Sequence, residues 1–258
     1  VFIASEGRVY ALDYRETAPR RATPDMYTPG GAYHEGLSLY GGTAVAVPGE
    51  VAGIEAALER FGTMPFEKVA GPAIALARNG FKVERHLASA IAGGREKIAA
   101  SESMAAMFLH EDGSPYAAGE LIRRPGLAST LEMMAKSGTR VFYEGVIAMD
   151  IAKAVSRHSG LVDAKDLGAY RVKWREPLLT DYRGRRVAGM GPPSSGGGTM
   201  ATALRVLEPY RLSDMGAGSA TYLHLLAEVL KAVFADRAAH YGDPDFIEFP
   251  LERLLSAD

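Results

Sequence analysis

The chain has 258 residues, of which 47% are hydrophobic and 23% are charged, a balance typical of a globular protein with a sizeable core. Its net charge is −2 with both signs interspersed, and no apolar run approaches the roughly 20 residues of a membrane helix, so we expect neither a nucleic-acid partner nor membrane insertion. The lack of cysteine excludes disulfides and a cysteine nucleophile, and none of the six histidines has a metal-binding spacing, so we expect no metal and no cofactor.

The first residues predict a β-hairpin. The apolar residues 1–4 and the strand-like run 8–12 flank a Ser-Glu-Gly turn. The first run is too short for the core of a signal peptide. We expect the sheet neighbours of this hairpin to lie outside the chain.

The next segment predicts a loop, a strand and two helices. Residues 29–42 are rich in glycine and predict a loop, and residues 43–47 predict a buried strand. The first helix is expected to end at Gly62. Pro72 is expected to open the second helix, which Gly80 ends.

The middle of the chain, residues 85–139, is expected to be mostly helical, and Gly138 is expected to end its last helix. A further helix is predicted over residues 143–159, with Val146 and Val155 near the two ends of its apolar face. Residues 163–170 predict a short, capped turn of helix.

The last third predicts a hairpin and a long helix. Residues 178–182 and 187–190 predict two strands joined by a tight turn, and residues 220–241 predict a helix with Phe234 facing inward. Three carboxylates near the end of this helix are expected to cap and terminate it rather than to act as acids or bases. They are Asp236, Asp243 and Asp245.

The loop 191–199, with the sequence Gly-Pro-Pro-Ser-Ser-Gly-Gly-Gly-Thr, permits two interpretations. Its backbone N–H groups could bind an anion at the start of a helix. The spacing fits neither of the common phosphate-binding motifs, and no base lies nearby to activate a serine. We therefore favour a strand-to-helix turn in which glycines allow close backbone packing.

Strands and helices coexist without the regular alternation of a doubly wound sheet. This pattern predicts an α+β fold with helices packed outside antiparallel strands. No proline- or serine-rich linker divides the sequence, so a single domain is predicted over residues 1–258.

The stretch 13–19, Asp-Tyr-Arg-Glu-Thr-Ala-Pro, carries the strongest functional signal. It places Arg15 at the end of a strand-like run, where a guanidinium can bind a substrate carboxylate through two parallel hydrogen bonds. The alternative is a surface ion pair of Arg15 with Glu16 or Asp13, which shares its strand face. Tyr14 and, later in the chain, Tyr143 are expected to be packing residues.

This heptapeptide resembles the Asp-x-Arg-Glu-x-Ala-Pro motif of the gamma-glutamyltranspeptidase family. Further segments resemble that family in the family's own order, and their collinearity makes the resemblance specific. They are residues 46–49 and 53; 123–125 and 127–131; 142–145; 160–161, 163, 166–167 and 170; 182–184 and 192–197; and 235–237 and 241–244.

The resemblance implies the four-layer αββα sandwich of N-terminal-nucleophile hydrolases. In that family a zymogen cuts itself into a large and a small subunit that share one sandwich. The catalytic threonine becomes the new N-terminus of the small subunit, with its α-amine as the base. The sequence lacks the family's Thr-Thr-His-like stretch, so we expect no catalytic residue in this chain and a small subunit from the same precursor as its partner.

The expected function is therefore that of the large subunit of a gamma-glutamyl transferase or hydrolase. Arg15 would bind the α-carboxylate of glutathione or another gamma-glutamyl substrate, and water, an amino acid or a peptide would accept the acyl group. The alternatives are a cephalosporin acylase, a poly-gamma-glutamate capsule hydrolase, or a non-catalytic carboxylate-binding relative. The resemblance implies a periplasmic or secreted protein if it is bacterial, and it leaves the cytoplasm open.

Overall fold

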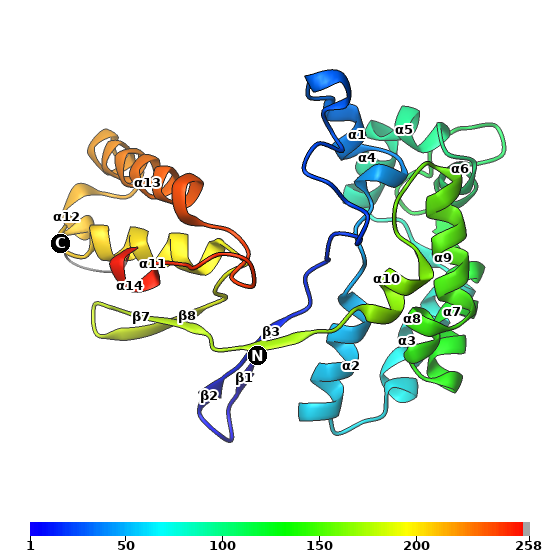
Figure 1. Cartoon of the computed structure of the whole chain (residues 1–258), viewed down its shortest axis with the longest axis horizontal. Helices are drawn as coiled ribbons and strands as arrows, with labels where there is room; N and C mark the ends of the chain where they lie inside the picture. The colour runs from blue at the N-terminus through cyan, green and yellow to red at the C-terminus, as the bar shows by residue number, and fades with distance from the viewer. Residues whose placement is uncertain (255–258) are drawn as a thin grey trace. The chain divides into compact units, whose positions relative to one another are not determined.

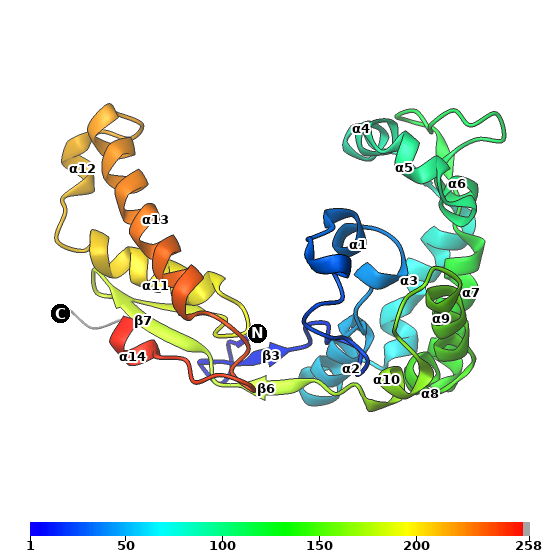
Figure 2. The ribbon, with the colours of Figure 1, turned by 45° about the horizontal axis from the view of Figure 1, so that its top comes forward.

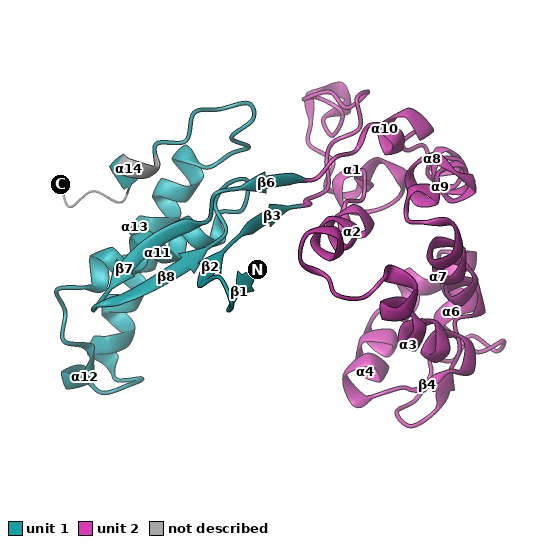
Figure 3. Ribbon diagram, turned by 90° about the horizontal axis from the view of Figure 1, so that it is seen from below, with its two compact units in different colours: residues 1–13, 173–258 teal, residues 14–172 magenta. Residues whose placement is uncertain are grey.

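The computed structural model describes residues 1–254, which separate into two compact units (Figures 1 and 3). Unit 1 contains residues 1–13 and 173–258, and unit 2 contains residues 14–172. The single domain predicted over residues 1–258 stays a prediction.

Unit 1 contains two local hairpins and one pair of strands that are far apart in the sequence. The hairpin of β1 (Phe2–Ile3) and β2 (Arg8–Val9) forms as predicted. Strand β3 (Ala11–Asp13) pairs antiparallel with β6 (Lys173–Arg175), and Asp13 lies opposite Lys173. The predicted second hairpin is confirmed as β7 (Leu178–Tyr182) and β8 (Arg185–Gly189).

Helices cover one side of the second hairpin. Helix α11 (Gly196–Leu207) contacts both β7 and β8, and α13 (Ala220–His240) packs along α11 (Figure 2). Their shared core contains Leu207, Val229 and Val233. The short helices α12 (Leu212–Met215) and α14 (Leu251–Leu254) complete the described part of this unit.

Unit 2 is mainly helical. Its elements in chain order are η1 (Pro29–Gly31), α1 (Glu35–Leu39), η2 (Gly42–Ala44), α2 (Glu50–Phe61), α3 (Phe66–Asn79), β4 (Phe81–Lys82), α4 (Arg85–Gly93), α5 (Arg95–Ala99), α6 (Glu102–Phe108), β5 (Leu121–Ile122), α7 (Pro125–Ser137), α8 (Arg140–Glu144), α9 (Val146–Arg157) and α10 (Ala164–Ala169). Strands β4 and β5 pair antiparallel. Helix α3 lies along α7, and α8 joins α7 to α9.

Local signals explain several helix ends. Gly62, Gly80 and Gly138 follow α2, α3 and α7, as predicted, and Gly80 and Gly138 adopt positive φ angles that favour glycine. Asp163 and Asp166 form a reciprocal capping box at the start of α10, which confirms the capped turn.

Three expectations in unit 2 are wrong. Pro72 lies inside α3 rather than at its start, because packing of α3 against α7 outweighs the roughly 3 kcal/mol that an internal proline costs. Residues 43–47 form a 3₁₀ turn and one isolated bridge instead of a strand. The helix predicted over 143–159 is broken at Gly145, whose extended backbone separates α8 from α9, and Val146 is exposed.

Two expectations in unit 1 also fail. Phe234 is 51% exposed, while Val229 and Val233 occupy the inward face of α13. Asp245 does not cap α13, whose last carbonyl contact comes from the backbone N–H of Tyr241. The carboxylate of Asp245 instead pairs with basic side chains of β6.

The predicted α+β class is confirmed: helices and short antiparallel strands share the chain. Within residues 1–254, no helix combines the length and the apolar character needed to cross a membrane. Over the same residues, no group of three or more His, Asp or Glu side chains is placed to hold a metal ion.

Candidate functional site

The first residue of the heptapeptide, Asp13, belongs to an ion-pair cluster in unit 1. Arg175 donates from Nε to its carboxylate at 2.7 Å, and the side chains of Arg175 and Asp13 are only 19% and 10% exposed. Arg175 also donates from Nη2 to Asp245 at 3.0 Å, and Lys173 pairs with the same carboxylate. Asp13 therefore has a structural partner that joins β3 to β6.

This cluster stabilises the charged form of Asp245. Hydrogen bonds from Arg175, and then from Lys173, lower the pKa of Asp245 from 3.8 to about 2. The same contacts raise the pKa of the Arg175 guanidinium, with the hydrogen bond to Asp245 as the main cause. Both groups are thus charged at neutral pH.

The main chain at Arg15, in unit 2, is held by hydrogen bonds at the Arg15 carbonyl and two residues later. Tyr170 donates from its hydroxyl to the carbonyl of Arg15 at 2.9 Å. Two residues later, Thr17 and Val47 exchange backbone hydrogen bonds of 3.2 and 2.9 Å. These contacts fix the backbone that carries the arginine.

The side chain of Arg15 is exposed, as a binding role requires. It is 57% exposed, and its Nε lies 3.6 Å from Oε1 of Glu16, which is equally exposed. A surface ion pair at that distance contributes little to stability. The predicted pairing with Glu16 is therefore present but loose, and it leaves the guanidinium accessible to solvent.

Two glycines allow the chain to pack closely beside this segment. A Cβ atom at Gly49 would overlap Oη of Tyr170 and the carbonyl oxygen of Tyr14, and a Cβ at Gly53 would overlap the ring of Tyr14. Glycine is required at both positions because α2 begins against the heptapeptide. Tyr14, predicted to be a packing residue, has this contact although it is 46% exposed.

A pair of buried tyrosines lies beneath Arg15. The rings of Tyr143 and Tyr170 stack at 5.7 Å between centroids and 10° between planes. The hydroxyl of Tyr143 donates to the carbonyl of Pro48 at 2.9 Å and accepts from the N–H of Ala52 at 3.1 Å. Burial raises the pKa of Tyr143, so this hydroxyl remains a donor. The prediction that Tyr143 is a packing residue is confirmed.

A second arginine near the motif has a structural role that the sequence did not reveal. Arg20 donates from Nε to Asp166 at 2.9 Å and from Nη2 to Asp163 at 3.2 Å, so it is bound to the capping box of α10. Asp166 is almost completely buried. Arg15 and Arg20 are thus five residues apart but differ in role, because Arg20 already has two carboxylate partners.

The glycine-rich loop in unit 1 forms a tight strand-to-helix turn. A Cβ at Gly197 would overlap the carbonyl oxygen of Met190, and a Cβ at Gly198 would overlap the hydroxyl of Tyr241. Arg237 donates from Nε to Oγ of Ser195 at 2.8 Å. The close-packing interpretation of this loop is therefore confirmed.

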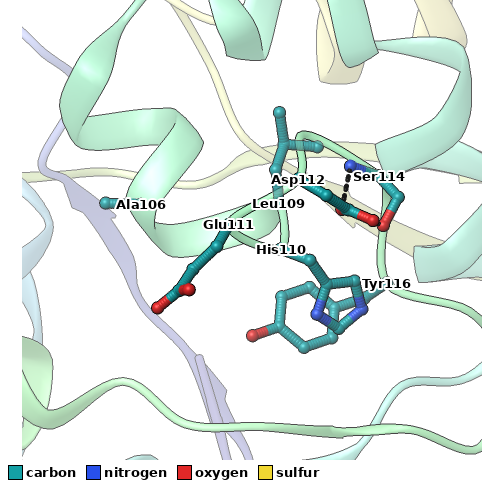
Figure 4. A pocket seen from close by; sticks show the side chains of 7 residues that line it. All are labelled: Ala106, Leu109, His110, Glu111, Asp112, Ser114 and Tyr116. Atoms are coloured by element: carbon teal, nitrogen blue, oxygen red, sulfur yellow. Dashed lines mark hydrogen bonds between the residues drawn. The ribbon is translucent and has the colours of Figure 1, made fainter.

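A separate pocket in unit 2 lies beside the loop after α6 (Figure 4). Its lining residues are Ala106, Leu109, His110, Glu111, Asp112, Ser114 and Tyr116. The imidazole of His110 lies 4.2 Å from the ring of Tyr116 and 3.2 Å from Oε2 of Glu120. Asp112 accepts hydrogen bonds from the N–H and hydroxyl of Ser114, and these lower its pKa. None of the heptapeptide residues lines this pocket.

The comparisons with known proteins agree with one another. A family model described as gamma-glutamyltranspeptidase matches residues 1–258. The glutathione hydrolase proenzyme of Escherichia coli K12 is 40% identical over 98% of this chain and 44% of its own length. An acylase proenzyme of Pseudomonas strain V22 is 37% identical over 97% of this chain and 46% of its own length.

A solved structure of similar fold agrees with the family model. The crystal structure of the gamma-glutamyltranspeptidase of Helicobacter pylori superposes with a TM-score of 0.96 at 36% identity. The match covers 99% of this chain and 73% of that one. The chain spans less than half the length of the curated relatives named above, which are both described as proenzymes.

Proposed function

The chain belongs to the gamma-glutamyltranspeptidase family, and we propose that it is the large-subunit part of an enzyme that cleaves gamma-glutamyl amides such as glutathione. The single observation that carries this proposal is the family match over residues 1–258, which includes the heptapeptide with its exposed arginine. The fold supports the proposal, because it is that of a solved gamma-glutamyltranspeptidase.

In this proposal the reaction proceeds through an ester on a threonine of a small subunit made from the same precursor. The threonine hydroxyl attacks the gamma-glutamyl carbonyl, its α-amine takes the proton, and the amine of the substrate leaves. Water, an amino acid or a peptide then attacks the ester and regenerates the threonine. No residue of this chain forms or breaks a bond.

Arg15 is proposed to bind the α-carboxylate of the gamma-glutamyl group. A guanidinium matches a carboxylate with two parallel hydrogen bonds and stays charged at any physiological pH. Its fixed main chain and exposed side chain support this role. By resemblance to the family we also propose a periplasmic or secreted location.

A related acylase remains the second candidate function. The observation that favours it is the acylase proenzyme, which is nearly as similar to this chain as the glutathione hydrolase, at 37% against 40% identity. A cephalosporin acylase from Bacillus halodurans also superposes with a TM-score of 0.88 at 27% identity. A poly-gamma-glutamate hydrolase and a non-catalytic relative are further outcomes that the test below distinguishes.

The test is to express the full-length precursor and to analyse it before and after denaturation. We expect two fragments, the larger one containing this sequence and the smaller one beginning with threonine. The purified protein should release the amine from a gamma-glutamyl anilide faster than it cleaves a cephalosporin side chain or poly-gamma-glutamate. A single uncut polypeptide would contradict self-processing, and a two-chain protein inactive on all three substrates would favour the non-catalytic alternative.

A further inference from the structure

The hydroxyl of Tyr170 donates a hydrogen bond to the carbonyl of Arg15. The distance is 2.9 Å, and the residues are 155 positions apart in the sequence. Tyr170 is only 6% exposed and belongs to the hydrophobic core of unit 2. A phenol in a packed core normally needs a hydrogen-bond acceptor, and here the acceptor is the peptide of the proposed substrate-binding arginine.

The orientation of Tyr170 is fixed by its surroundings. Its ring stacks on that of Tyr143, whose hydroxyl is itself bound to the backbone of Pro48 and Ala52. Gly49 provides the space for the Tyr170 hydroxyl, because any side chain there would overlap it. The hydroxyl is therefore held where it meets the Arg15 carbonyl.

We infer that Tyr170 is a positioning residue for substrate recognition, acting through the main chain of Arg15. The inference rests on the proposed function, in which Arg15 binds the substrate carboxylate. The guanidinium of Arg15 can be placed only as precisely as the backbone that carries it, so a fixed main chain supports recognition of the carboxylate. Tyr170 provides that fixed point at the carbonyl group attached to the Cα of Arg15.

The test compares Tyr170→Phe with Tyr27→Phe in the full-length protein. Phenylalanine keeps the stacked ring and removes only the hydroxyl. Tyr27 is the control, because its hydroxyl likewise donates to a backbone carbonyl of unit 2, that of Thr43, at 3.0 Å. The loss of one neutral hydrogen bond corresponds to a change of about 3- to 10-fold in an equilibrium constant.

The kinetic result expected for Tyr170→Phe is an increase of about 3- to 10-fold in KM for a gamma-glutamyl anilide, with kcat nearly unchanged. The analogue that lacks the α-carboxylate should be unaffected. In an Arg15→Ala background the same substitution should have no further effect, because both changes act on one contact. Additive effects of the two substitutions, or an equal effect of Tyr27→Phe, would overturn the inference.

Hydrogen exchange gives a second readout that does not depend on activity. Amides in the segment 14–18 should exchange about 3- to 10-fold faster in Tyr170→Phe than in wild type or Tyr27→Phe. Unchanged exchange would show that the hydroxyl does not hold this segment. Faster exchange together with an Arg15→Ala variant that loses activity equally on both substrates would overturn the proposed role of Arg15 while leaving the backbone contact established.

Discussion

Arg175 donates a 2.7 Å hydrogen bond from Nε to the carboxylate of Asp13, a residue 162 positions earlier in the sequence. The bond joins the paired strands β3 and β6, and both side chains are largely buried. Two of the three charged residues of the heptapeptide therefore differ in role: Asp13 stabilises the fold, and Arg15 is the proposed ligand-binding group.

Asp13→Ala is expected to destabilise the protein by about 1–3 kcal/mol, because it removes one carboxylate partner from a guanidinium that is only 19% exposed. The measurement is the denaturant midpoint of the full-length protein. Asp181→Ala is the control: its pair with Arg186 spans 3.9 Å and both side chains are about three-quarters exposed, so we expect almost no change. Equal effects of the two substitutions would contradict the structural role of Asp13.

The contribution of Asp245 to stability should depend on pH. Its pKa is about 2 in the folded protein against 3.8 for the free side chain, with the Arg175 hydrogen bond as the main cause. Because the folded pKa is the lower one, the contribution is fully present above about pH 4 and is lost as the pH falls toward 2.

The measurement for Asp245 is the difference in Tm between wild type and Asp245→Asn. We expect wild type to be more stable by a few degrees at pH 6, and the difference to shrink steadily between pH 4 and pH 2. The other carboxylates are the same in both proteins, so their effects on Tm cancel in the difference. A gap that stays constant down to pH 2 would mean that the charge of Asp245 is not what matters.

Gly197→Ala is expected to destabilise unit 1 by about 1–3 kcal/mol or more, because the added Cβ overlaps backbone atoms of Met190 that cannot move aside. Gly196→Ala is the matched control in the same helical turn. Its Cβ would have only Ser194 Oγ nearby, at 3.8 Å, so alanine should be neutral or slightly stabilising. The measurement is the Tm of the two variants. A Gly197→Ala protein with the same Tm as Gly196→Ala would refute the close-packed turn.

Arg15→Ala should lower kcat/KM for a gamma-glutamyl anilide by about 10- to 150-fold, corresponding to about 1.5–3 kcal/mol for a charged hydrogen-bond partner. Arg15→Lys should restore only part of the loss, since an ammonium cannot make the two parallel contacts. Unfolding midpoints should remain unchanged, because the side chain is exposed. The comparison substrate lacks the α-carboxylate, and an equal loss on both substrates would make Arg15 a structural residue.

Much of the molecule could be predicted from short stretches of sequence. Gly62, Gly80 and Gly138 indicated where three helices end, and the box of Asp163 and Asp166 indicated where another begins. Residues close in sequence generate these signals, so one sequence suffices to find them. Arg15 was found in the same way, through a motif of seven consecutive residues, and its binding role stays a proposal.

Local signals were insufficient where distant segments compete. Pro72 has the local properties of a helix start, yet the contact of α3 with α7 carries the helix through it. Asp245 has the local properties of a cap, yet Arg175 and Lys173 attract its carboxylate. In both cases the deciding free energy comes from residues that are far away in the sequence.

The sequence by itself therefore determined the family, the α+β class and the arginine that is proposed to bind the substrate carboxylate. Only the tertiary structure identified the partners that act on this segment, Tyr170 at the carbonyl of Arg15 and Gly49 beneath the Tyr170 hydroxyl. The physical reason is that a hydrogen bond and a steric contact depend on distances of a few ångströms, and residues 155 positions apart reach such distances only when the chain has folded.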